Sequence, residues 1–115
     1  MIGVDIGGTN LLVGLIKDGV VIERLHQPIQ AIGDFELVAL QTCEAIREIA
    51  GNTIESVGIA VAGSVDATKG IVLRAENLNW DNAPLARYVS TELHCKVVVE
   101  NDVTAAAWGE FNYGA

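Results

Sequence analysis

The strongest constraint on the fold is a short apolar run that ends in three polar residues and continues into an alanine-rich segment. Residues 96–99 are rich in β-branched side chains and predict a short buried strand. Glu100, Asn101 and Asp102 interrupt this pattern, and residues 103–108 then predict a helix because alanine has the highest helix propensity. In open α/β sheets, ligands bind just beyond the carboxyl ends of strands, where Asn101 and Asp102 are expected. Alternatively, either residue serves only as a helix N-cap.

A second pattern opens the chain, where a four-residue turn joins two apolar strands expected over residues 2–6 and 11–16. The turn consists of Gly7, Gly8, Thr9 and Asn10. Paired glycines permit positive φ and let a ligand approach the backbone, and the two polar side chains add donors, so the turn can cradle phosphate oxygens. Taken alone, this turn also fits an ordinary glycine hairpin. Asp5 would face phosphates only through a cation, for which we expect Mg²⁺.

Composition bounds the class of protein. The 115 residues suffice for one domain with a core, and 50% hydrophobic against 19% charged residues indicates a globular chain. A net charge of −8 argues against a nucleic-acid-binding surface. No run reaches the length of a membrane span and the start is unlike a signal peptide, so we expect no membrane partner and a cytoplasmic protein. Cys43 and Cys95 lack C-x-x-C spacing and are expected to be small buried residues.

Turn and cap signals order the elements between the two patterns. Asp18-Gly19 predicts a second hairpin, so residues 20–26 would form the third strand of an antiparallel meander. Asp34 is the expected N-cap of a helix that closes at Gly51. The apolar stripe of this helix is predicted to consist of Leu37, Leu40, Ala45, Ile46 and Ile49.

The second half of the chain continues with a strand, a hairpin and another helix. The mostly apolar residues 54–62 predict a strand buried on both faces of a parallel sheet. Residues 66–70 predict a hairpin loop in which Asp66 has a turn role rather than a catalytic one, and residues 84–93 predict a second helix. A meander followed by right-handed β-α-β crossovers predicts an α/β fold with a mixed five-stranded sheet flanked by helices, the ribonuclease-H-like arrangement.

Further candidates for ligand contact lie in this half. Gly63 would share an edge of the sheet with Asn101 if their strands run parallel, and it is either a point of close approach by a ligand or a plain turn glycine. Residues 76–80 show no helical or strand period, and the Asn side chains among them offer both a donor and an acceptor to ligand hydroxyl groups. Trp80 is either a stacking platform or, as is commoner, an anchor in the core.

Four segments together resemble the ROK family of sugar kinases (repressor, open reading frame, kinase), in the actin-like ATPase superfamily. In chain order they are Asp5-Ile6-Gly7-Gly8-Thr9-Asn10, residues 58–66, residues 75–80 and Val99-Glu100-Asn101-Asp102. The third segment is similar to the sugar-contacting loop of bacterial glucokinases. The resemblance covers only the N-terminal lobe of the family, which implies that residues 1–115 form that lobe and that the C-terminal lobe is absent from this chain.

The resemblance implies ATP-dependent phosphorylation of a hexose, with glucose as the expected substrate. Phosphoryl transfer needs positioning, charge neutralisation and one residue that accepts the hydroxyl proton. We assign that base to Asp102, because a base must reach the sugar hydroxyl whereas Asp5 sits beside the phosphate turn. The expected sugar ligands are Gly63, Asn77, Asn101 and Asp102. The expected ligands of the ATP phosphates are Gly7, Gly8, Thr9 and Asn10, with Asp5 near Mg²⁺.

Two alternatives belong to other functional classes. The family also contains sugar-sensing transcription repressors, which need a DNA-binding helix-turn-helix before the phosphate turn, whereas Met1 here directly precedes the first strand. The other alternative is a catalytically idle sugar-binding lobe, because the second lobe of the family carries further sugar ligands, a zinc site and the adenosine pocket. Zinc is therefore expected only in the second lobe. Surfaces of this chain that would contact the second lobe are expected to be apolar, which leads us to expect homo-oligomers.

Overall fold

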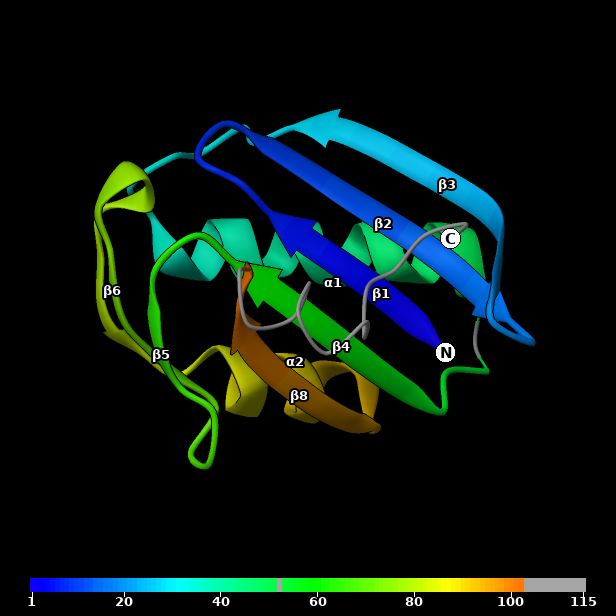
Figure 1. Ribbon diagram of the computed structural model, residues 1–115. Helices are drawn as coiled ribbons and strands as arrows, with labels where there is room; N and C mark the ends of the chain where they lie inside the picture. Colours follow the sequence, from blue (N-terminus) through cyan, green and yellow to red (C-terminus); the bar gives the residue numbers. More distant parts are fainter. Residues whose placement is uncertain (52, 103–115) are drawn as a thin grey trace.

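A mixed five-stranded sheet forms the centre of the computed structural model, which describes residues 1–51 and 53–102 (Figure 1). The strand order is β3-β2-β1-β4-β8. The strands are β1 Ile2–Ile6, β2 Asn10–Lys17, β3 Val20–Pro28, β4 Ser56–Val61 and β8 Lys96–Asn101. The first three form an antiparallel meander, and β1, β4 and β8 run parallel to one another. The predicted mixed sheet is therefore confirmed.

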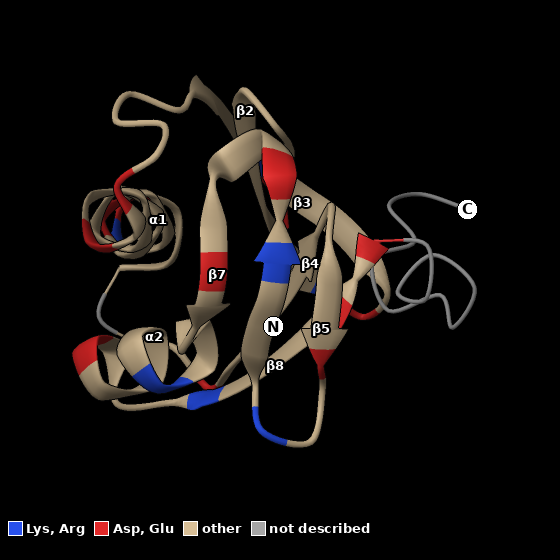
Figure 2. Ribbon diagram, turned by 90° about the vertical axis from the view of Figure 1, so that its left-hand side faces the viewer, with Lys and Arg blue, Asp and Glu red and all other residues tan. Residues whose placement is uncertain are grey.

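Two helices, α1 Phe35–Ala50 and α2 Leu85–Leu93, cover the same face of this sheet (Figures 1 and 2). The predicted limits of α1 are confirmed, since the Asp34 side chain accepts a hydrogen bond from the Leu37 N–H at 3.1 Å and Gly51 closes the helix at φ 70°. The predicted stripe was wrong at Leu37, which is 51% exposed, and at Leu40, which is only partly buried and lies outside the core. The buried face of α1 consists of Val38, Ala39, Thr42, Cys43, Ala45, Ile46 and Ile49.

The core lies between the helices and the central strands. Alternate residues of the strands point into it, including Val4, Ile59 and Val99, each fully buried. Trp80 is 1% exposed and packs edge-to-face on the Phe35 ring at 5.1 Å, which confirms its commoner use as a core anchor. Burial also raises the pKa of the Cys43 thiol to about 12, which makes this thiol a poor nucleophile. Cys95 is only partly buried, less than expected.

A small second sheet stands beyond the ends of β1 and β4 (Figures 1 and 2). It consists of β5 Ser64–Asp66, β6 Ile71–Ala75 and β7 Trp80–Ala83, with the 3₁₀ turn η1 Glu76–Leu78 between the last two. The predicted turn role of Asp66 is confirmed, because its side chain accepts a hydrogen bond from the Lys69 N–H at 3.2 Å. Strand β7 was not predicted, because its two central residues are exposed and polar and leave no alternating pattern.

Strand β8 is longer than predicted. Glu100 and Asn101 were expected to follow the strand, but they pair with Ala60 and Val61 of β4 and belong to it. Asp102 follows the strand with a helical assignment, and the predicted helix at residues 103–108 lies outside the described residues. Within the described part of the chain, no helix is long and apolar enough to span a membrane, and no three His, Cys, Asp or Glu side chains gather to hold a metal ion.

Candidate functional site

The carboxyl ends of three parallel strands meet at one edge of the central sheet. Ile6 of β1 is in register with Val61 of β4, which is in register with Asn101 of β8. The glycine turn and Asp102 follow directly after β1 and β8, and Gly63 follows β4 after one intervening residue. The sequence prediction that Gly63 and Asn101 share an edge of the sheet is therefore correct, because β4 and β8 pair in parallel, and the glycine turn and Asp102 lie at the same edge.

The turn between β1 and β2 is closed by backbone hydrogen bonds. The Gly7 N–H donates to the Asn10 carbonyl oxygen at 2.9 Å, and the Ile29 N–H donates to the Thr9 carbonyl oxygen at 2.9 Å. The Asn10 side-chain amide donates to the Thr9 hydroxyl at 3.0 Å, so these two polar side chains are held together. Neither glycine adopts the positive φ that glycine permits, so the turn does not use the left-handed region.

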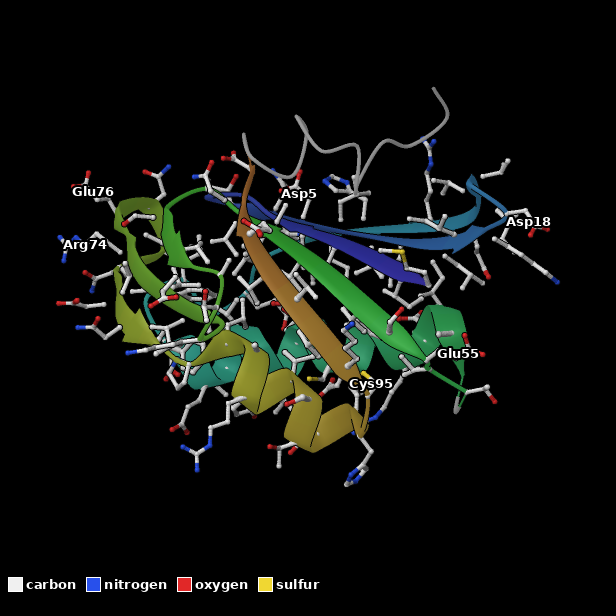
Figure 3. The ribbon with its side chains drawn as sticks, turned by 60° about the horizontal axis from the view of Figure 1, so that its bottom comes forward. Asp5, Asp18, Glu55, Arg74, Glu76 and Cys95 are labelled. Atoms are coloured by element: carbon white, nitrogen blue, oxygen red, sulfur yellow. The ribbon has the colours of Figure 1, made fainter. Side chains whose placement is uncertain are left out.

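Asp5 lies on the face of the sheet opposite the helices, because its neighbours Val4 and Ile6 are buried on the helix side. Figure 3 shows it near the end of β8, at the opposite end of that strand from Cys95. Burial, and secondarily the nearby Asp102 carboxylate, raise the pKa of the Asp5 carboxyl above its usual range. Two carboxylates that repel each other at a partly buried edge are hard oxygen donors, and they fit a hydrated Mg²⁺ ion, which would offset the repulsion.

Asn101 ties the end of β8 to the loop that follows β4. Its side-chain amide donates a hydrogen bond to the Gly63 carbonyl oxygen at 2.5 Å. Gly63 is itself pressed against β6: a Cβ at this position would overlap the Arg74 carbonyl oxygen and lie 3.1 Å from the Ala75 Cα. The need for glycine here therefore comes from packing between the two sheets, in addition to whatever a ligand requires.

Asn77 enters the same region from η1. It lies against the glycine turn, since a Cβ placed on Gly8 would be 2.9 Å from the Asn77 Cβ. Beside it is an open pocket of about 360 Å³, large enough for a hexose. The pocket is lined by Ala62, Gly63, Ser64, Arg74, Glu76 and Asn77.

Four of these lining residues were not predicted as site residues, namely Ala62, Ser64, Arg74 and Glu76. Ala62, Ser64 and Glu76 are sequence neighbours of predicted site residues, which was the available signal. Arg74 reaches the pocket because it pairs with Ser64 in the second sheet, and no pattern in the sequence specified that pairing. Arg74 also lies 3.9 Å from Asp81 in an exposed ion pair, and Figure 3 shows Arg74 and Glu76 on the outer side of the second sheet.

Known proteins match this chain along its whole length. The sequence pattern that defines the ROK family covers residues 1–115. The glucokinase of Streptomyces coelicolor is 36% identical over 114 residues, which are 98% of this chain and 36% of that protein. The glucokinase of Thermotoga maritima is 36% identical over 118 residues, which are 100% of this chain and 37% of that protein. The chain therefore spans little more than a third of these relatives.

Solved structures show the same fold. The ROK family glucokinase from Streptomyces griseus, in complex with glucose and AMPPNP, superposes with a TM-score of 0.85 at 38% identity, over 100% of this chain and 37% of that one. This similarity confirms the predicted α/β arrangement of the actin-like ATPase fold. Repressors match as well: the xylose repressor of Caldicellulosiruptor bescii is 38% identical over 61 residues, which are 53% of this chain and 15% of that protein.

Proposed function

This chain belongs to the ROK family, and from that premise we propose that it is the N-terminal lobe of a longer sugar kinase that phosphorylates a hexose with ATP. The observation that carries the proposal is the convergence of Asp102, Asn101, Gly63 and Asn77 beside the Gly7–Asn10 turn. The comparisons support a sugar kinase, and glucose is our proposed substrate because glucokinases are among the similar proteins. Use of ATP would place the protein in the cytoplasm.

Asp102 is the proposed general base. It follows directly after β8 at the edge where the candidate sugar ligands gather, so it lies in the right region to accept the proton of a sugar hydroxyl. Asn77 and Asn101 would hold other hydroxyls, and the Gly63 backbone would allow the ring a close approach. The base and these ligands lie on strand ends and short turns of one scaffold. The sugar hydroxyl that attacks the phosphoryl group would therefore be held in a fixed orientation.

The Gly7–Asn10 turn would hold the ATP phosphates, with backbone N–H groups and the linked Thr9 and Asn10 side chains as donors. The AMPPNP complex of the Streptomyces griseus glucokinase supports a nucleotide as the phosphate donor. Asp5 would hold Mg²⁺, and the chemistry that the ion would supply is neutralisation of charge on the transferred phosphoryl group.

The test is the variant Asp102→Asn in the full-length parent protein, with glucose, ATP and Mg²⁺ in a coupled assay. Loss of the base should lower kcat by ~10²–10⁴, equivalent to ~3–5 kcal/mol, while calorimetry shows glucose affinity nearly unchanged. Asp66→Asn is a matched control, because it makes the same chemical change at a turn carboxylate in the second sheet. A kcat for Asp102→Asn within tenfold of the wild type would remove Asp102 from this role.

A repressor lobe is the second candidate, favoured by the match to the xylose repressor over half of the chain. A repressor needs to bind its sugar but has no need to transfer a phosphoryl group. Assays of the wild-type parent protein distinguish the two functions, because a sugar kinase both binds a hexose and phosphorylates it. Sugar binding without any product, together with binding of a DNA duplex that responds to the sugar, would favour the repressor.

A further inference from the structure

The two glycines of the phosphate turn differ in what surrounds them. Neither adopts a left-handed conformation, so backbone geometry does not require glycine at either position. A Cβ on Gly7 would come no closer than 3.5 Å to another atom, the Asn10 carbonyl oxygen, which is ordinary van der Waals contact. A Cβ on Gly8 would lie 2.9 Å from the Asn77 Cβ and 3.1 Å from its Nδ2 atom. Glycine is therefore needed at position 8 because of Asn77.

Asn77 cannot move away from this contact cheaply. Its Cβ position is fixed by the η1 backbone, which is flanked by Ala75 and Leu78, both at most 1% exposed. The turn is closed by the Asn79 N–H, which donates to the Glu76 carbonyl oxygen at 3.1 Å. Rotation about χ1 can move the Asn77 amide, but it leaves the Cβ in place. The contact with Gly8 therefore joins two backbone segments rather than a loose side chain and a turn.

We propose that Gly8 is a positioning residue for the sugar side of the site: because Gly8 has no Cβ, Asn77 can pack against the phosphate turn. Through this contact, the position of Asn77 depends on the conformation of the phosphate turn. This inference rests on the proposed function, in which Asn77 holds a sugar hydroxyl and the turn holds the ATP phosphates.

The test compares two alanine variants of the parent protein by calorimetry, with glucose alone and with AMPPNP alone. Gly8→Ala must displace η1 from the turn, so it should weaken glucose binding by about tenfold or more although position 8 is not a proposed sugar ligand. Gly7→Ala is the matched control: it alters the same turn and is free to change AMPPNP binding, but glucose affinity should stay within about threefold of the wild type.

A second variant identifies the contact itself. Asn77→Gly removes the Cβ that a residue-8 side chain would meet, so it should relieve the conflict in the double variant Gly8→Ala/Asn77→Gly. The double variant should therefore bind AMPPNP with the same affinity as Asn77→Gly alone. If Gly8→Ala does not fold, recovery of folding in the double variant supports the contact, and failure to recover overturns the inference.

The outcomes separate the inference from the function on which it rests. A wild-type parent that binds glucose, with both alanine variants weakening glucose binding to the same extent, overturns the role of Gly8 and leaves the sugar-kinase proposal standing. A wild-type parent that binds no hexose overturns the proposed function and the inference with it.

Discussion

Substituting Gly63 by alanine should destabilise the fold through one identifiable contact. The added methyl group would overlap the Arg74 carbonyl oxygen and crowd the Ala75 Cα and Cβ, both at 3.1 Å. Gly63 has no positive φ, so backbone strain contributes little. The loop after β4 must therefore move away from β6, and the Gly63 carbonyl moves with it out of reach of the Asn101 amide.

The expected cost follows from these two changes. Overpacking against a fixed backbone costs about 1–3 kcal/mol, and loss of a hydrogen bond adds about 0.5–1.5 kcal/mol, so we expect roughly 2–4 kcal/mol in the free energy of unfolding. For a domain near 100 residues, each kcal/mol corresponds to about 4–8 °C in Tm. Circular dichroism of the 115-residue chain, with urea and with heat, measures both quantities.

Ser64→Ala is the control for this measurement, because Ser64 is the next residue and its side chain is exposed. Its effect on stability should be within about 0.5 kcal/mol. If Gly63→Ala is equally mild, then the loop after β4 has room to relax, and packing between the two sheets does not explain the glycine.

Three other predictions concern the charge of Asp5 and the activity and oligomeric state of the isolated chain. Because burial and Asp102 raise the pKa of Asp5, the folded state binds that proton more tightly than the unfolded state, and the stability gained from protonation is lost as pH rises through the raised pKa. Asp5→Asn should therefore raise Tm at about pH 7 and raise it less near about pH 4, and calorimetry showing an equal rise at both values would contradict the pKa direction. The 115-residue chain by itself should fold but yield no glucose 6-phosphate above background, since closure of a second lobe supplies much of the alignment. Turnover by a preparation free of full-length contaminant would contradict this. The isolated chain should also form dimers or larger oligomers, because Val20 and Ile22 are each 56% exposed, and a monomer in light scattering would contradict that expectation.

The sequence predicted well wherever one residue type has one strong local use. Asp34 and Gly51 marked the ends of α1, and Asp18-Gly19 marked a hairpin, because caps and tight turns depend on their own few residues. The meeting of Gly63 with Asn101 was also predictable, since buried apolar strands joined by helices pair in parallel and bring their carboxyl ends together. The candidate sugar and phosphate segments followed from this topology and from the family resemblance.

Features that depend on contacts between distant segments were not predictable. Leu37 has the spacing of a core residue, but Val38 and Ala39 occupy the face that meets the sheet, which turns Leu37 outward. Arg74 enters the pocket only because β6 pairs with β5. The contact between Gly8 and Asn77 likewise joins residues far apart in sequence, and nothing in either segment alone indicates the other.

These contacts bear on which residues distinguish a kinase from a sugar sensor of the same family. Gly63 is required by the packing of the second sheet, and Gly8 by the position of Asn77. A protein that only binds its sugar would need both glycines as much as an enzyme does, since losing either displaces a candidate sugar ligand. The phosphate turn therefore indicates the family and its sugar site more directly than it indicates catalysis. Asp102 is different, because the proposed acceptance of a proton from the sugar hydroxyl has a use only where phosphoryl transfer occurs. Measurements that separate kcat from sugar affinity at Asp102 are thus more decisive than any substitution in the turn.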